Sequence, residues 1–142
     1  MNELVLNQKD LLVMNLVNYF MTDKNYNPII VHGVKDEIWL ENMESDYKII
    51  RIVTHYIHND EQYDFDLFRA TKIMERIKKK TFSFGMNAIS IFLNLGDNVN
   101  FDSKESPKNL MCINITDTES ALMEEKLLNI FPNLNQTFDN KE

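Results

Sequence analysis

The stretch from Asp46 to Tyr56 reads DYKIIRIVTHY, and its pattern predicts the centre of the fold. Side chains alternate between the two faces of an extended chain. Apolar residues fall on both faces of this one: Tyr47, Ile49 and Val53 on one, Ile50 and Ile52 on the other. A strand with two apolar faces is normally covered on both sides. We therefore expect residues 46–56 to form a central strand between two layers.

The elements around this strand predict an α/β fold with the order α-β-β-β-α-β-β-α. Periodicity and capping signals predict helices at 8–22, 60–81 and 121–131, and strands at 29–32, 36–41, 46–56, 86–95 and 110–115. Three consecutive strands can form a meander, and the helix after them returns the chain to a parallel neighbour. We expect a single mixed β-sheet of about five strands, with helices on both of its faces.

Length, charge and cysteine content narrow the class of protein. The 142 residues suit one domain, assigned to 1–132, with a polar tail or linker at 133–142. The net charge of -7 argues against a nucleic-acid partner, because phosphate binding needs a clustered positive surface. A single cysteine, Cys112, excludes an internal disulfide and fits a reducing compartment. No apolar run approaches the roughly 20 residues of a membrane span, so we expect a soluble, cytoplasmic domain.

Histidines and acids gather where the central strand ends. His55 and His58 lie at that end, and Arg51 shares a strand face with His55. In the next helix, Asp66 precedes apolar residues at +4, +7 and +11, so it falls on the apolar stripe. A buried carboxylate is costly unless it is paired or binds a cation. Because strand and helix are consecutive, we expect them to pack together and bring His55 within reach of Asp66.

One interpretation of this corner is a small metal site. His55, His58 and Asp66 would supply two nitrogens and one oxygen, and Asp60 or Asp64 would serve as a further or outer ligand. Imidazole ligands favour the later transition metals, so such a set suits a divalent Mn or Zn ion, or Fe, better than Ca or Mg.

The other interpretation is a buried ion pair. Asp66 would accept a charge-assisted hydrogen bond from Arg51 or His55, and His58 would lie on the surface. The His-x-x-His spacing alone has no cysteine partner and no His-Glu-x-x-His frame, so it does not by itself establish a metal site. The sequence leaves both interpretations open.

A nuclease-like pattern offers an enzymatic alternative. Asp36, followed by Asp46 and Lys48 at the start of the next strand, is similar to the active-site frame of the restriction-nuclease-like superfamily. In that chemistry two carboxylates hold Mg and the lysine positions the attacking water. Asp46 and Lys48 are also ordinary residues for a strand that follows a turn, and the acidic surface disfavours DNA.

Trp39 suggests a third possibility, a plain protein-interaction module. It lies between Glu37 and Glu41 on the face of strand 36–41 that carries these acids, so it is expected to be half-buried. Core packing is the ordinary role of such a residue, and anchoring a partner protein is the alternative.

The run Asp36-Glu-Ile-Trp-Leu-Glu41 resembles part of the soluble amino-terminal domain that precedes the membrane part of a group of bacterial rhomboid intramembrane serine proteases. The resemblance continues through Ile50-Arg51, His55 and the helix around Asp66. It returns at Phe131-Pro132 and so covers most of the chain. The catalytic membrane part of such a protease is not among these residues.

The resemblance implies a regulatory, sensory or adaptor domain at the cytoplasmic face of the membrane, not an enzyme in its own right. Its partners would be the membrane-embedded protease domain of the same chain and a protein substrate or adaptor. Arg51, His55 and Asp66 match the family pattern, whereas His58 stands where that pattern has an Asp. A small metal site would give such a sensory domain its ligand, a metal ion.

Overall fold

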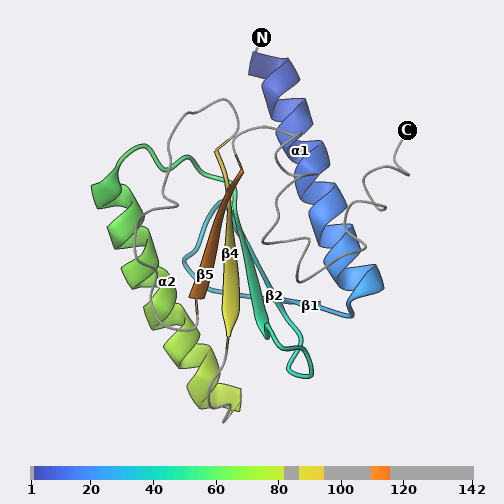
Figure 1. Ribbon diagram of the computed structural model, residues 1–142, viewed down its shortest axis with the longest axis vertical. Coiled ribbons are helices and arrows are strands. Elements are labelled where there is room, and N and C mark those ends of the chain that lie inside the picture. The colour runs from blue at the N-terminus through green and yellow to red at the C-terminus, as the bar shows by residue number, and fades with distance from the viewer. Residues whose placement is uncertain (1, 82–86, 95–109, 116–142) are drawn as a thin grey trace.

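The computed structural model describes residues 2–81, 87–94 and 110–115 (Figure 1). Its elements in chain order are α1 (Asn2–Asn18), the π-helical turn η1 (Tyr19–Asp23), β1 (Asn27–Ile29), β2 (Glu37–Glu41), β3 (Ile49–Val53), α2 (Asp60–Thr81), β4 (Ala88–Leu93) and β5 (Leu110–Ile115). One five-stranded sheet has the order β1-β2-β3-β4-β5. Strands β1 to β3 are antiparallel neighbours, whereas β3, β4 and β5 run parallel. The predicted α/β class with a single mixed sheet is confirmed.

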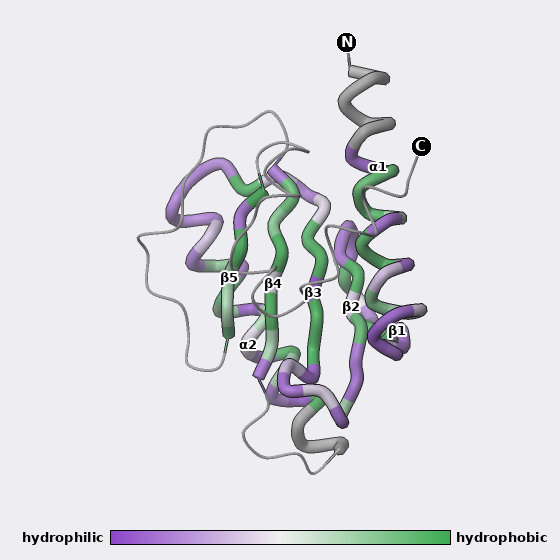
Figure 2. Tube along the Cα trace, turned by 45° about the vertical axis from the view of Figure 1, so that its right-hand side comes forward, coloured by the Kyte–Doolittle hydropathy of each residue, from purple (hydrophilic) through white to green (hydrophobic). Residues whose placement is uncertain are grey.

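The two helices cover opposite faces of the sheet, as Figure 1 shows. Leu12 and Leu16 of α1 belong to one core with Ile50 and Ile52 of β3, while the α2 side holds a second core with the other face of that strand. All five residues of β3 are buried, because the strand is central and is covered on both sides. Figure 2 shows hydrophobic residues along most of β3 and β4.

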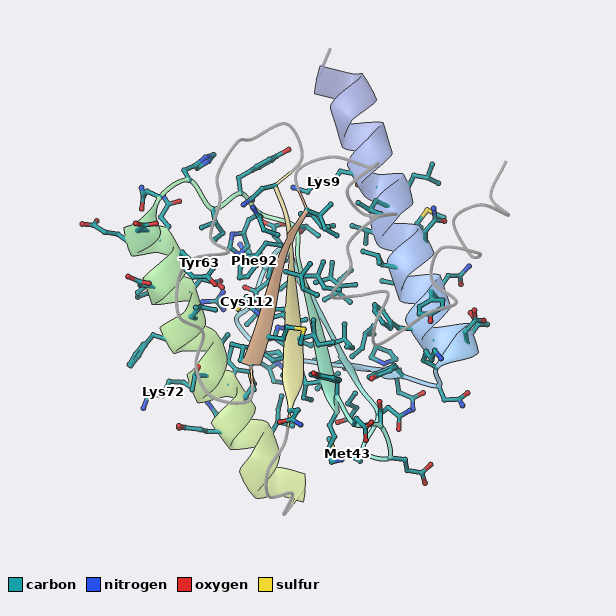
Figure 3. The ribbon with its side chains drawn as sticks, in the orientation of Figure 1. Lys9, Met43, Tyr63, Lys72, Phe92 and Cys112 are labelled. Carbon is teal, nitrogen blue, oxygen red and sulfur yellow. The ribbon has the colours of Figure 1, made fainter. Side chains whose placement is uncertain are left out.

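The helix α2 packs through the apolar stripe that the sequence predicted. The stripe residues buried in the α2-side core are Tyr63, Leu67, Ala70 and Ile73. Figure 3 shows Tyr63 reaching toward Phe92 of β4, and their ring centroids lie 5.5 Å apart. Lys72 lies on the outer side of the helix and is exposed. This packing fixes the inward-facing side of α2 against the sheet face that carries Ile49 and Val53 of β3.

Several predicted boundaries differ from the structure. The first helix begins at Asn2 and ends in η1, and β5 has its predicted bounds, whereas the other four strands are shorter than predicted. The first strand ends at Ile29, because the residues after it form the turn back to β2, with a positive φ at Gly33. Tyr47 packs against the α1-side core and not beside Val53, since regular alternation starts only at Ile49. The predicted helix at 121–131 and the tail at 133–142 lie outside the described residues.

Neither α1 nor α2, as far as the structure describes them, is both long enough and apolar enough to cross a bilayer.

The start of α2 is capped by a pair of side chains. The backbone N–H of Gln62 donates to Asn59 Oδ1 at 2.9 Å, which is an N-cap hydrogen bond. Gln62 Oε1 in turn accepts from the backbone N–H of His58 at 2.8 Å. These bonds fix the point at which the chain leaves the sheet and enters the helix.

We predict that Asn59→Ala lowers the free energy of unfolding by about 1 kcal/mol, because a helix N–H loses its acceptor. Urea denaturation followed by circular dichroism measures this. Asn59→Ser keeps a capping oxygen and is expected to be close to wild type. Equal stability of the two variants would show that the cap does not stabilise α2.

Candidate functional site

The guanidinium of Arg51 lies inside the protein, between the sheet and α2. Arg51 is the middle residue of β3 and is 1% exposed. Its Nε donates to Ser90 Oγ at 2.9 Å, from the directly opposite position on β4. The rings of Trp39 and Phe92 lie 5.7 and 5.4 Å from its Cζ, within the range of cation–π attraction. The sequence placed Arg51 in the strand as a possible partner of Asp66, and the structure places it at the centre of a buried polar cluster.

Two carboxylates neutralise Arg51. Asp66 of α2 accepts two hydrogen bonds from the guanidinium, from Nη1 to Oδ1 at 3.1 Å and from Nη2 to Oδ2 at 2.5 Å. Glu37 of β2 accepts a third bond from Nη1 to Oε1 at 2.9 Å. The side chains of Asp66 and Glu37 are 3% and 1% exposed. Bidentate arginine–carboxylate pairs are among the strongest hydrogen-bonded pairs in proteins, so this contact holds α2 to the sheet.

Arg69 and His55 complete the cluster on its open side. Arg69 Nη2 contacts both Glu37 Oε2 and, at 3.1 Å, Asp66 Oδ1. His55 Nε2 lies 3.5 Å from that Glu37 oxygen and 3.9 Å from that Asp66 oxygen. Both side chains are about one-third exposed, unlike the other three. We call Glu37, Arg51, His55, Asp66 and Arg69 the arginine–carboxylate cluster.

The backbone of β2 places Glu37 beside Arg51. In the antiparallel register Glu37 pairs with Val53 and Trp39 pairs with Arg51, so Glu37 and Arg51 are diagonal neighbours on one face. Asp36 precedes the strand with φ 59°, a left-handed conformation that Asp tolerates better than most residues. Its carbonyl accepts from Thr54 N at 2.9 Å and Thr54 Oγ1 at 2.8 Å. This turn ties the start of β2 to the end of β3.

Other hydrogen bonds hold the connection between β3 and α2, which carries His55. Lys9 of α1 donates to the carbonyl of Thr54, and its Nζ lies 3.9 Å from the centre of the Tyr56 ring. Asn94, just after β4, accepts from the backbone N–H of Ile57 at 3.1 Å and donates to its carbonyl at 3.4 Å. His55 therefore lies on a segment held from two neighbouring elements.

The charges of the cluster balance when His55 is neutral. Arg51 and Arg69 contribute two positive charges, and Glu37 and Asp66 contribute two negative ones. Burial by itself would raise the pKa of Glu37, but hydrogen bonding to His55, the charge of Arg51 and bonds from both arginines lower that pKa to about 2. Burial likewise lowers the pKa of Arg51, and the hydrogen bonds and charges of Asp66 and Glu37 outweigh it and raise that pKa. The cluster is therefore a satisfied ion-pair network.

The open side of the cluster borders a pocket of about 300 Å³. Its lining residues are His55, Tyr56, Ile57, Gln62, Phe65, Asp66 and Arg69. Two of these residues, His55 and Asp66, can bind a metal ion together with Glu37: the ligand atoms of the three all lie within 4.8 Å of one another. The pocket gives solvent and small solutes a route to His55 and Asp66.

The structure brings together some of the residues singled out from the sequence and not others. Arg51, His55 and Asp66 meet as expected, and the ion pair between Arg51 and Asp66 is present. His58 lies outside the cluster, because the chain turns to the surface there and its ring stacks on Tyr56 at 5.9 Å.

The two acids proposed as further ligands also lie elsewhere. Asp60 and Asp64 are exposed residues in the first turns of α2 and are not part of the group that can hold a metal ion. The sequence did not predict Glu37 and Arg69 as members of this site. The three-residue spacing between Asp66 and Arg69 was a usable signal, since such residues are neighbours on a helix surface.

Trp39 is not the surface anchor that one interpretation required. It is 3% exposed and packs in the α2-side core, so a partner protein cannot reach it without unfolding the sheet face. Its ring lies 5.7 Å from Arg51 Cζ, so Trp39 packs beside the arginine–carboxylate cluster.

The nuclease-like frame is not assembled either. Asp36 precedes the first residue of β2, whereas Asp46 lies in the connection at the far end of the β2–β3 pair. Five residue pairs of the ladder separate these ends, which at about 3.4 Å per residue is too far for two carboxylates to share one Mg ion. Lys48 Nζ donates to the Ser45 carbonyl at 3.0 Å.

A scan against protein-family models gives no match for this chain, and a search of curated proteins also finds no matching relative. An inference about function therefore rests on the chemistry of the cluster, together with the resemblance in sequence described above.

We predict that Asp66→Ala destabilises the protein by about 3–5 kcal/mol, because it leaves the buried Arg51 short of a counter-charge. Chemical denaturation measures the loss. The control Asp64→Ala changes an exposed acid of the same helix and is expected to shift stability by less than about 0.5 kcal/mol. The double variant Arg51→Met with Asp66→Leu should recover part of the loss. Similar, small effects of Asp66→Ala and Asp64→Ala would contradict the ion-pair account.

The lowered pKa of Glu37 predicts a specific pH dependence. A carboxyl whose pKa is depressed in the folded state stabilises the fold above its unfolded pKa and loses that effect as pH falls through the folded pKa. The free energy of unfolding should therefore drop between about pH 5 and pH 2, with this group contributing at most about 3 kcal/mol.

Urea denaturation at stepped pH tests this prediction. Glu37→Gln should show a shallower decline below about pH 5 than the wild type. Glu41→Gln, at the other end of the same strand, should retain the wild-type decline. Parallel pH profiles for wild type and Glu37→Gln would overturn the assignment.

Proposed function

We propose that the chain is a non-enzymatic regulatory domain that binds a divalent transition-metal ion through Glu37, His55 and Asp66. The observation that carries the proposal is the convergence of three ligand-type atoms within 4.8 Å, two of them from residues that line an open pocket. One imidazole nitrogen and two carboxylate oxygens form a donor set that suits Mn or Zn better than Ca or Mg. His58, Asp60 and Asp64 are not needed as ligands.

The spacing of the donor atoms fits a shared ion. Ligand atoms around a tetrahedral zinc ion lie roughly 3.4 Å apart, because each bond is about 2.1 Å long. His55 Nε2 lies 3.5 Å from Glu37 Oε2 and 3.9 Å from Asp66 Oδ1. Small movements of these side chains would therefore suffice to bring all three atoms onto one ion, with the pocket side left for water.

Arg51 and Arg69 compete with a metal ion for the two carboxylates, which favours reversible metal sensing over a permanently bound metal cofactor. Both carboxylates already accept hydrogen bonds from Arg51 and Arg69, so an incoming ion replaces existing interactions. Binding is then weaker than at a site of unpaired ligands, and occupancy varies with the concentration of free metal. A domain of this kind reports metal availability, whereas a catalytic metal must stay bound.

The resemblance to the amino-terminal domains of rhomboid proteases supplies the setting of the proposal. In that setting the domain lies at the cytoplasmic face of the membrane and passes its state to a membrane-embedded protease domain of the same chain. It does so directly or by recruiting a protein substrate or adaptor. The residues that support this link are the run Asp36–Glu41 together with Arg51, His55 and Asp66.

Isothermal titration with Zn²⁺ and with Mn²⁺ tests the metal site. We expect one ion per chain in the wild type and at least about a tenfold loss of affinity in His55→Ala, since one of three protein ligands is removed. His58→Ala is the matched control, because it removes the neighbouring histidine outside the cluster, and its affinity should equal that of the wild type.

His55→Ala is preferable to a change of Asp66, because His55 is partly exposed and its loss leaves the pairing of Arg51 intact. Equal heats for wild type and His55→Ala, or loss of binding in His58→Ala instead, would overturn the proposed site.

A further inference from the structure

Arg69 occupies the position that a bound cation would need. Its Nη2 contacts Glu37 Oε2 and Asp66 Oδ1. These are the same two oxygens that lie nearest to His55 Nε2. A positively charged nitrogen therefore already lies between the two carboxylates on the side that faces the imidazole.

We propose that Arg69 is a built-in competitor for the metal ion, which must leave the carboxylates when the ion binds. This inference rests on the proposed metal site. Asp66 Oδ1 already accepts hydrogen bonds from Arg51 Nη1 and from Arg69 Nη2, so an ion that binds this oxygen must replace one of the two donors. Metal binding is thus an exchange of one cation for another.

Of the two arginines in the cluster, only Arg69 is placed to move. Arg51 is 1% exposed, is bonded to Ser90 as well as to both carboxylates, and lies close to two aromatic rings. Arg69 is 32% exposed, contacts one oxygen of each carboxylate, and lines the pocket. Arg51 therefore keeps the carboxylates in place while Arg69 is displaced toward solvent.

The exchange converts a change in metal concentration into a change of surface charge. The released guanidinium lies on α2 beside Phe65, which lines the same pocket and is 68% exposed. In the metal-free protein this charge is neutralised by the carboxylates, and in the metal-bound protein it faces the solvent. The outer surface of α2 thereby gains a positive charge next to an exposed aromatic residue.

Removal of the competitor should strengthen metal binding. We expect Arg69→Gln to bind Zn²⁺ about five- to tenfold more tightly than the wild type in isothermal titration, because the ion no longer breaks ion pairs. Arg69→Lys retains a cation and should stay near the wild-type affinity. Arg76→Gln removes an exposed arginine from the same helix, so it controls for the general effect of net charge and should change affinity less than twofold.

The displacement itself can be measured by chemical modification. The chain has three arginines, Arg51, Arg69 and Arg76, and phenylglyoxal labels them according to their exposure. Mass spectrometry of the labelled protein should show Arg69 modified at least about twofold faster when Zn²⁺ is present, because its side chain is then solvated. Arg51 should stay protected and Arg76 should stay reactive under both conditions, so they serve as internal references.

The outcomes separate this inference from the proposed function. Metal binding that depends on His55, combined with unchanged or weaker affinity in Arg69→Gln and unchanged labelling of Arg69, would overturn the exchange and leave the metal site standing. No Zn²⁺ binding by the wild type or by Arg69→Gln would overturn both. Tighter binding in Arg69→Gln together with metal-dependent labelling of Arg69 would support both.

Discussion

The guanidinium of Arg51 is the constraint around which this fold is arranged. A buried charge costs several kcal/mol unless its partners are well placed. Three elements supply those partners to the arginine on β3: Ser90 comes from β4, Glu37 from β2 and Asp66 from α2. Because these contacts form together only in one register of the sheet and one placement of α2, they specify the arrangement at which His55 and Arg69 meet the carboxylates.

Much of the fold could be predicted from the sequence where one periodicity was strong over a long stretch. The central position of Ile49–Val53 followed from its two apolar faces, and the bounds of α2 followed from its periodicity and capping signals. Short elements were less predictable. The strand β1 has only three residues, which is too short for a periodic pattern. The side on which Tyr47 packs depends on a hydrogen bond that its carbonyl accepts from the Tyr26 hydroxyl, and no local sequence pattern indicates that contact.

The site was predictable in part for the same physical reason. The helical periodicity singled out Asp66, and the alternation of the strand placed Arg51 on the same face as His55. Each of these patterns lies within a single element and can therefore be recognised from the sequence. Glu37 could not be assigned, because its position depends on the β2–β3 register, which the intervening turn sets. His58 was expected at the site because it is close to His55 in sequence, but the turn into α2 places it outside the cluster. The ion-pair and metal interpretations also proved to concern the same atoms: Glu37 and Asp66 pair with arginines and are the oxygens that an ion would use.

The most direct test of this account is a pair of crystal structures, one grown without metal and one with Zn²⁺, with anomalous diffraction to locate the ion. The account predicts Arg69 against both carboxylates in the first. In the second it predicts one anomalous peak bonded to Glu37, His55 and Asp66, with Arg69 displaced and the pair between Arg51 and Asp66 unchanged. The absence of any peak at these three side chains, with Arg69 in the same position in both crystals, would contradict it.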